Sequence, residues 1–207
     1  MDYQPQLEQL SQNALTFFEE KEKTRELSLS LHRQIIKLSG NAIKMMHRGD
    51  FDKAEGLLGE AREAVDSLSK ILGSHPDIYY GGFIQSAQKE YAEARCFQSV
   101  ILSKPLPTAN ALHVDFAPYL NGLGEAIGEL RRYVLDNLRR GDFERVEPIL
   151  QIMDDLYYVL TAVDYPDALT QGLRRTADIA RSLVEKTRGD LTTALQQRRL
   201  EQALKQK

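Results

Sequence analysis

The sequence lacks tryptophan and contains a single cysteine, Cys96, among its 207 residues. One thiol excludes an intramolecular disulfide, and no second cysteine is present to build a thiolate zinc site. Cys96 is followed by Phe97 in a helical pattern, so we expect it to be a small packing residue of the core.

Long apolar runs are also missing from the sequence. No run approaches the roughly 18 apolar residues of a membrane-spanning helix, and the N-terminus is acidic and polar, unlike a secretory signal. We therefore expect a cytoplasmic protein with no membrane partner. A strong positive charge is absent as well, since the formal net charge is −3. A protein of this charge binds nucleic acid only if its basic residues gather on one surface.

What the sequence does contain is helical periodicity. Hydrophobic residues make up 42% of the chain and charged residues 28%, with glycine and proline clustered between long periodic segments. The predicted helices cover about residues 7–47, 51–72, 77–103, 116–140, 143–163 and 168–206. The first range fits either one long helix or two helices that meet near residues 21–24. We expect an all-α fold, a bundle of about six or seven long antiparallel helices in one domain spanning residues 1–207.

Two features of the connections add detail. The tetrapeptide Arg-Gly-Asp-Phe occurs at 48–51 and again at 140–143. Glycine is a common C-terminal cap and aspartate a good N-cap, so each copy is expected to end one helix and begin the next. The proline-bearing segment 105–115 predicts an ordered crossover rather than a flexible linker.

Two pairs of glutamates are the candidate functional groups. Glu90 and Glu93 are three residues apart, and Glu125 and Glu129 are four residues apart, so each pair shares one face of its helix. One or two carboxylates are what Mg²⁺ takes from a protein, the rest of its shell being water and phosphate oxygens. Each pair on its own also fits a solvated helix face, because such spacing is common on helix surfaces. The second pair lies nearly opposite the apolar stripe of its own helix.

Taken together, the motifs resemble the translin family, and most closely its translin-associated factor X branch. The similar segments are EYAEA at 90–94, FQ at 97–98, YLxG at 119–122 and GELxR at 128–132. The resemblance covers most of the chain from about Leu27 onwards. It implies a translin-like helical fold that assembles into a closed oligomer.

The resemblance also implies a function for the glutamates. In that branch the residues matching Glu90, Glu93, Glu125 and Glu129 hold Mg²⁺, which Mn²⁺ can replace, for cleavage of RNA phosphodiester bonds. Glu125 stands where the family has Asp. Two glutamates would then ligate the metal while another accepts a proton from the attacking water. The implied assembly is a homo-oligomer, with an octamer as one expected size.

Basic residues near the glutamates are candidates for RNA contacts. We prefer Lys89 and Arg132, because each neighbours an acidic motif and would hold the RNA backbone beside the metal. The other basic candidates are Arg95, Arg131, Arg139, Arg140, Arg174 and Arg175. The histidines, at positions 32, 47, 75 and 113, lack the Glu-x-x-His spacing of a ferritin-like di-iron site, and we expect them to serve surface or turn roles.

The leading hypothesis is therefore a Mg²⁺-dependent endoribonuclease that cleaves single-stranded or short duplex RNA inside an oligomeric shell. The alternative is a helical scaffold protein of the translin type that binds RNA or single-stranded DNA without cleaving it. Mg²⁺-dependent cleavage that disappears in a Glu93→Ala variant would favour the first hypothesis, and binding without cleavage the second.

Overall fold

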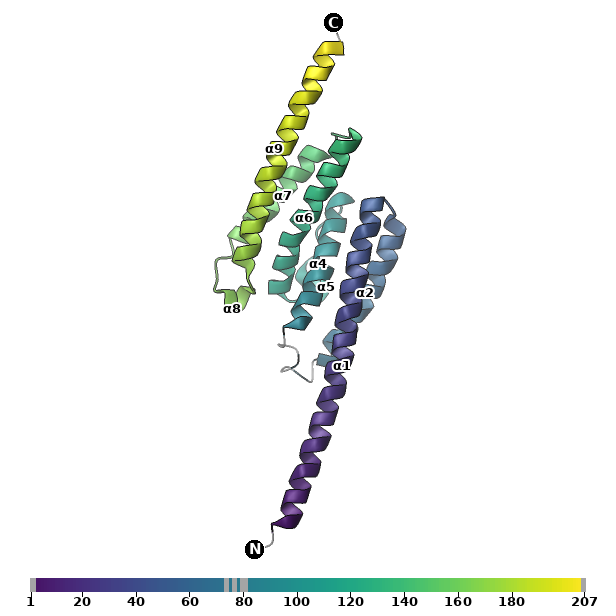
Figure 1. The fold of residues 1–207 in the computed structure, drawn as a ribbon, viewed down its shortest axis with the longest axis vertical. Coiled ribbons are helices and arrows are strands. Elements are labelled where there is room, and N and C mark those ends of the chain that lie inside the picture. Colours follow the sequence, from purple (N-terminus) through teal and green to yellow (C-terminus); the bar gives the residue numbers. More distant parts are fainter. Residues whose placement is uncertain (1–2, 73–74, 76–77, 79–81, 206–207) are drawn as a thin grey trace.

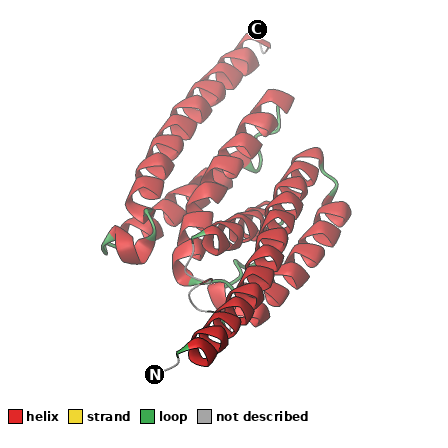
Figure 2. Ribbon diagram, turned by 60° about the horizontal axis from the view of Figure 1, so that its bottom comes forward, coloured by secondary structure: helices red, strands yellow, loops and turns green. Residues whose placement is uncertain are grey.

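Long α-helices joined by short connections make up the structure (Figure 1). The computed structural model describes residues 3–72, 75, 78 and 82–205. The long helices are α1 (Gln4–Arg48), α2 (Phe51–Leu72), α4 (Phe83–Ile101), α6 (Phe116–Arg140), α7 (Val146–Thr161) and α9 (Leu173–Lys205), and the short ones are α5 (Ala109–Leu112) and α8 (Asp167–Thr170). The described residues contain no strand (Figure 2), which confirms the all-α fold. No helix among them is long and apolar enough to cross a membrane.

Most helix bounds agree with the predictions, and α4 differs at its start. Helices α2 and α6 match their predicted ranges, and α1 continues without a break through 21–24. Helix α4 begins at Phe83 instead of residue 77, which lies outside the described residues. Gly82 precedes it with φ 86°, a left-handed conformation that a right-handed helix cannot contain. The local backbone conformation, and not the apolar pattern, sets this boundary.

The last helix also begins later than predicted. Helix α9 starts at Leu173 rather than near 168, because Gln171 and Gly172 have φ of 54° and 84° and separate it from the short α8. Once begun, α9 continues through Gly189 to Lys205. A single glycine costs a helix only about 1 kcal/mol, which the rest of this long helix tolerates.

The repeated Arg-Gly-Asp-Phe sequence ends both α1 and α6 in the same way. Gly49 and Gly141 have φ of 81° and 76°, and each backbone N–H reaches carbonyls of the last helical turn. The second half of the repeat differs. Asp50 accepts a hydrogen bond from the backbone N–H of Lys53 at 3.3 Å and α2 begins at once, whereas α7 begins only at Val146. The predicted start of the helix at 143 is therefore wrong by three residues.

The connections decide the relative directions of the helices. Helix α1 packs on α2 and α4, α4 packs on α6, and α6 packs on α7 and α9. Helices joined by short turns, such as α1 and α2, run antiparallel, as expected (Figure 1). The crossover returns the chain to the beginning of α4, where the backbone N–H of Asp115 donates to Gln88 Oε1 at 3.4 Å. Helices α4 and α6 therefore run in the same direction, and Tyr119 helps to hold the crossover by donating its hydroxyl hydrogen to the Pro107 carbonyl at 2.8 Å.

Helix α4 lies at the centre of the core. Tyr91, Cys96 and Phe97 are fully buried. Burial raises the pKa of the Cys96 thiol to about 12, so the thiol stays protonated and behaves as a small apolar group. The predicted packing role of Cys96 is confirmed.

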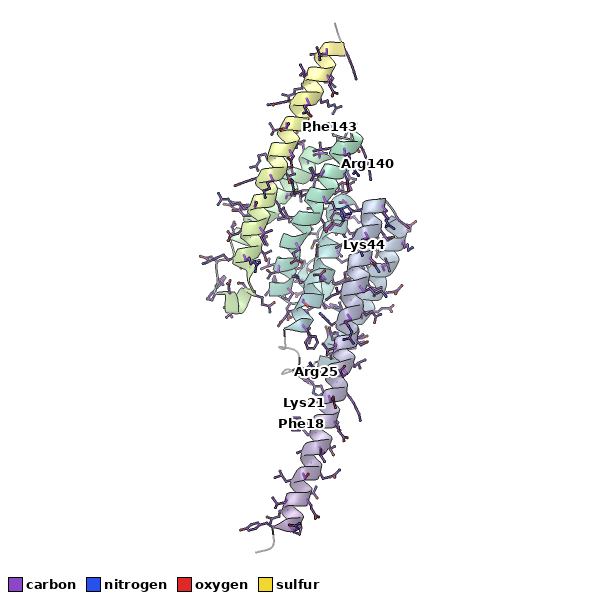
Figure 3. All side chains as sticks on the ribbon, in the orientation of Figure 1. Phe18, Lys21, Arg25, Lys44, Arg140 and Phe143 are labelled. Atoms are coloured by element: carbon purple, nitrogen blue, oxygen red, sulfur yellow. The ribbon has the colours of Figure 1, made fainter. Side chains whose placement is uncertain are left out.

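The N-terminal part of α1 and the C-terminal part of α9 extend beyond the bundle in opposite directions (Figure 1). Apolar side chains remain exposed on both extensions, and Phe18 is visible on the α1 extension in Figure 3. The exposed apolar residues of the extensions are Leu7, Leu10, Leu15, Phe17, Phe18 and Leu27 on α1 and Leu200 and Leu204 on α9. In a single chain these apolar side chains are exposed in groups on the two extensions, unlike the scattered single apolar residues of an ordinary protein surface.

The backbones of α6 and α4 come very close together at Gly122. A Cβ atom there would lie 2.5 Å from the Lys89 carbonyl oxygen and 2.9 Å from the Glu93 backbone nitrogen. We expect Gly122→Ala to destabilise the protein by about 1–3 kcal/mol, because two helix backbones must separate. Gly128→Ala is the matched control on the same helix, since its Cβ would meet Leu183 Cδ1 at an ordinary 3.7 Å. Thermal unfolding decides, and equal melting temperatures for the two variants would contradict the tight contact.

Candidate metal centre

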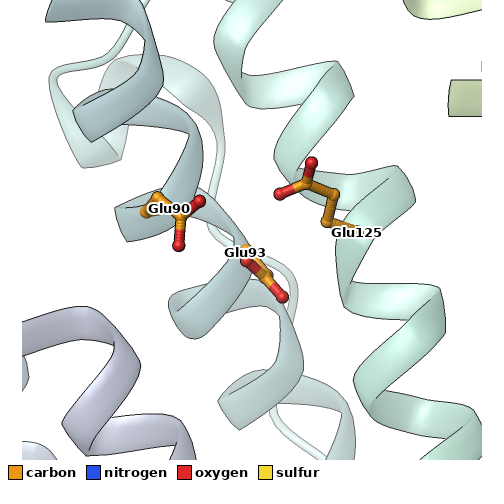
Figure 4. Close-up of side chains that lie close together, drawn as sticks. All are labelled: Glu90, Glu93 and Glu125. Carbon is orange, nitrogen blue, oxygen red and sulfur yellow. The ribbon is translucent and has the colours of Figure 1, made fainter. Parts of the chain in front are cut away.

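Three of the four predicted glutamates come together inside one chain. Glu90 and Glu93 on α4 and Glu125 on α6 each offer one carboxylate oxygen, and these oxygens lie within 4.8 Å of one another (Figure 4). The three-residue spacing puts the first two on one side of α4. The close approach at Gly122 then brings Glu125, three residues later on α6, opposite them. The face opposite the apolar stripe of α6 is thus partly covered by α4, and the Glu125 side chain on it remains 37% exposed.

Crowding and burial disfavour the charged forms of these carboxylates. The Glu93 side chain is nearly buried, with the residue 8% exposed. Burial, together with the negative charges of Glu90, Glu125 and Glu129, raises the pKa of Glu93 to about 8. The pKa of Glu90 is also raised, first by burial and then by Glu125. The site therefore has less positive charge than would be needed to balance all of its carboxylates in their ionised forms.

Lys89 supplies part of the missing charge. Its Nζ lies 2.5 Å from Glu125 Oε1 and 3.8 Å from Glu90 Oε1. Burial works against the ammonium, but the hydrogen bond and the charge of Glu125 raise the pKa of Lys89 overall. One ammonium stands against three clustered carboxylates, so the pKa values of Glu90 and Glu93 remain raised in its presence.

Glu129 lies beside this group and is held by a residue far away in the sequence. His47, in the last turn of α1, has its Nε2 atom 2.6 Å from Glu129 Oε2. A carboxylate only accepts hydrogen bonds, so Nε2–H donates. The His47 side chain is 4% exposed and its ring stacks on Phe97 at a centroid distance of 4.9 Å. The expected surface or turn role is wrong for His47. Its position four residues after the apolar Ile43, on the same face of the predicted helix, was the signal in the sequence.

The preferred basic residues differ in their positions. Lys89 belongs to the cluster, whereas the Arg132 side chain is 59% exposed with Nη1 3.9 Å from Glu129 Oε2, at the outer edge. Arg95 lies on another side of α4, where it pairs with Glu55 at 3.0 Å. Arg131 pairs with Asp190 on α9, Arg139 with Asp136 and Arg174 with Asp164. Arg175 lines a groove that also contains Lys89 and Glu125.

The donor set fits a hard divalent cation. All three clustered donors are carboxylate oxygens, the ligands that Mg²⁺ and Mn²⁺ prefer, and the group includes no thiolate or imidazole. Bound positive charge would also offset the burial and the neighbouring negative charges that raise the pKa of Glu93. The residues present therefore suit Mg²⁺ on chemical grounds.

Comparison with known proteins adds independent information. No family model matches the chain. An uncharacterized protein of Methanocaldococcus jannaschii is 32% identical over 195 residues, which cover 92% of this chain and 85% of that protein. The chain is also similar to two solved structures of Archaeoglobus C3PO (AfC3PO). The duplex RNA complex is 34% identical with a TM-score of 0.85, and the other structure is 33% identical with a TM-score of 0.84.

In both of these comparisons the match covers 90% of this chain and 97% of the other chain. The structure of apo-NeC3PO from Neurospora is 24% identical with a TM-score of 0.77, over 94% of this chain and 100% of that one. At this identity it shows a shared fold alone. The similarity extends over nearly the whole length of each protein, so the carboxylate cluster lies within the matched fold.

Proposed function

This chain belongs to the translin family, close to its translin-associated factor X branch, and from that premise we propose that it is an RNA-binding endoribonuclease that uses Mg²⁺. The observation that carries the proposal is the gathering of three carboxylate oxygens within 4.8 Å, from Glu90, Glu93 and Glu125. The similar AfC3PO structure is a complex with duplex RNA, which supports RNA as the ligand of this chain. The substrates that we propose are single-stranded RNA and short RNA duplexes.

Glu90, Glu93 and Glu125 would hold the cation. When bound, Mg²⁺ or Mn²⁺ supplies a water of lowered pKa and neutralises negative charge on the phosphate. The protein's own contribution is the environment of the ligands. Because Glu93 is buried and surrounded by like charges, its ionised form depends on nearby positive charge, and ionisation is therefore coupled to cation binding.

Glu129 is suited to the proton transfer. It lies next to the clustered carboxylates but outside their group, and its carboxylate is oriented by the hydrogen bond from His47 at 2.6 Å. A general base must be held within hydrogen-bonding reach of the water that it deprotonates. We assign the proton-accepting role to Glu129 and the orienting role to His47. Lys89, hydrogen-bonded to Glu125, is positioned to hold a phosphate beside the cluster.

The apolar side chains on the α1 extension support a homo-oligomer, which we propose to be a closed shell such as an octamer. Phe18 is 65% exposed and makes an edge contact with Phe17, which is 52% exposed. Light scattering at micromolar concentration should give a mass several times that of one chain, and Phe18→Asp should lower it with unchanged circular dichroism. A parent protein that is monomeric would contradict the shell.

Cleavage of labelled RNA by the purified protein tests the proposed function. We expect cleavage with Mg²⁺, no cleavage with a chelator, and recovery when Mg²⁺ or Mn²⁺ is added back. RNA or single-stranded DNA binding without cleavage under all of these conditions would replace the endoribonuclease with the scaffold alternative. Absence of any nucleic-acid binding would exclude both.

A further inference from the structure

A groove opens directly beside the carboxylate cluster. It has a volume of about 560 Å³ and runs between α4, α6 and the turn that joins α8 to α9. Lys89 and Glu125 line it, so it is continuous with the candidate metal centre. Pockets of about 300–1,000 Å³ typically hold small ligands, and one nucleotide of a longer strand falls within that range. The groove is therefore large enough for the part of a substrate that extends beyond the reacting phosphate.

Its inner wall is a fixed hydrogen-bonded structure. Asn121, which is 5% exposed, donates from Nδ2 to the carbonyls of Ala117 and Thr170, each at 2.9 Å. Its Oδ1 accepts from the hydroxyl of Thr176 at 2.7 Å. These bonds connect α6 to α8 and α9 and hold the wall in place. A preformed wall lowers the cost of ordering a ligand against it.

The rim of the groove carries a second cation besides Lys89. Arg175 on α9 lines the groove, and no described residue forms an ion pair or hydrogen bond with it. The preceding residue, Arg174, pairs with Asp164 at 2.9 Å. Consecutive residues of a helix point about 100° apart, which places the two guanidinium groups on different sides of α9. Only Arg175 of these two neighbours is directed to the groove.

The remaining rim residues favour a phosphate-sugar chain over a simple anion. Gln85 and Ser86 on α4 are polar, and Ile179 on α9 is 52% exposed and supplies an apolar surface for a ribose or base. The carboxylate that lines the groove, Glu125, is already hydrogen-bonded to Lys89. A guanidinium, polar groups and one apolar surface are the groups that recognise a nucleotide.

We propose that this groove binds the RNA nucleotide adjacent to the cleavage position, with Arg175 on its backbone phosphate. The planar guanidinium donates two parallel hydrogen bonds to a phosphate, a geometry that lysine cannot provide. Lys89 marks the end of the groove next to the glutamates, and Arg175 contributes from α9. The carboxylate cluster lies where α4 meets α6. From there the RNA strand runs along the groove towards α9. This inference rests on the proposed function, because it requires that the protein bind RNA.

Arg175→Gln and Arg174→Gln form a matched pair that tests the groove. Binding of a labelled single-stranded RNA is measured by fluorescence anisotropy in a chelator, so that cleavage does not interfere, over a range of salt concentrations. We expect Arg175→Gln to weaken binding about 5- to 10-fold and to reduce the slope of log K against log salt by about 0.7. Arg174→Gln should bind like the parent, since it replaces a cation that is already paired. Circular dichroism checks that both variants remain folded.

The outcomes separate this inference from the proposed function. Parent-like affinity and salt slope for Arg175→Gln would overturn the proposal that the groove binds a nucleotide. Equal weakening of binding in both variants would overturn it too, because it would indicate only a general loss of positive charge. A parent protein that binds no RNA would overturn the proposed function itself. Because binding is measured without Mg²⁺, an absence of cleavage would leave the result for the groove unchanged.

Discussion

Glu93→Gln will remove Mg²⁺-dependent RNA cleavage, with a fall in rate of at least about 100-fold. The substitution keeps the side-chain volume but deletes one negative charge from the three-carboxylate group. A bound metal ion contributes several kcal/mol to charge stabilisation, and each 1.4 kcal/mol or so corresponds to a tenfold change in rate. Glu125→Gln should have a similar effect. Cleavage of labelled RNA at saturating Mg²⁺ provides the measurement.

The same variant should be more stable than the parent in a metal-free buffer, and the gain should depend on pH. The pKa of Glu93 is raised from 4.5 to about 8 in the folded protein, so between these values the folded state holds a proton that the unfolded state has released. Parent stability therefore falls as pH rises through this window, and the loss is complete above about pH 8. Thermal unfolding in a chelator should show no gain for Glu93→Gln at pH 4 and a gain of roughly 1–3 kcal/mol at pH 8.5.

Glu60→Gln is the control for both measurements. Glu60 is an exposed carboxylate on α2, outside the cluster, so its replacement should leave cleavage unchanged and alter stability by less than about 0.5 kcal/mol. If Glu93→Gln and Glu125→Gln both cleave RNA like the parent, the shared metal site is wrong. The non-catalytic binding protein would then be the better description.

His47→Phe should lower the rate of RNA cleavage by about 10- to 100-fold, the usual cost of losing a group that orients a ligand or base. Phenylalanine retains the stacking on Phe97 but has no donor for Glu129, whose hydrogen bond at 2.6 Å is lost. His47→Gln places an amide donor at a similar reach and should recover part of the rate. Because His47 acts through Glu129 and does not touch RNA, kcat should fall while KM stays unchanged.

A purely structural role for His47 predicts a different pattern. In that case loss of rate would follow loss of thermal stability, and the Gln variant would gain nothing over the Phe variant at equal stability. Parallel measurements of unfolding temperature, kcat and KM on both variants separate the two roles. Parent-like cleavage by His47→Phe would remove the histidine from the proposed mechanism.

Local features of the sequence determined the helices and the faces on which the glutamates lie. The apolar periodicity and the glycine caps predicted the exact bounds of α2 and α6, because turns and helix ends depend on neighbouring residues. The spacing of Glu90 and Glu93 placed both on one side of α4 for the same reason. Exceptions arose where backbone conformation was decisive, as at Gly82 and Gly172, whose positive φ values leave no periodic signal.

Only the tertiary structure decided what those faces meet. The sequence left Glu125 and Glu129 nearly opposite the apolar stripe of α6, which equally fits a solvated surface. The parallel packing of α4 and α6, with its close contact at Gly122, brings Glu125 to Glu90 and Glu93 and buries Glu93. Burial and the crowding of like charges are what raise the pKa of Glu93, and both depend on helices that the spacing within one helix cannot place.

The local sequence pattern could not predict which residue contacts Glu129 or which cation lines the groove. His47 is 82 positions from Glu129 in the sequence, and Arg175 belongs to the last helix, yet the packing of α1 on α4 and of α6 on α9 brings both to the same region. Helix-to-helix contacts are chosen by the burial of many apolar side chains at once. The sequence thus determined which groups are available and on which helix face, and the packing of the core determined which of them act together.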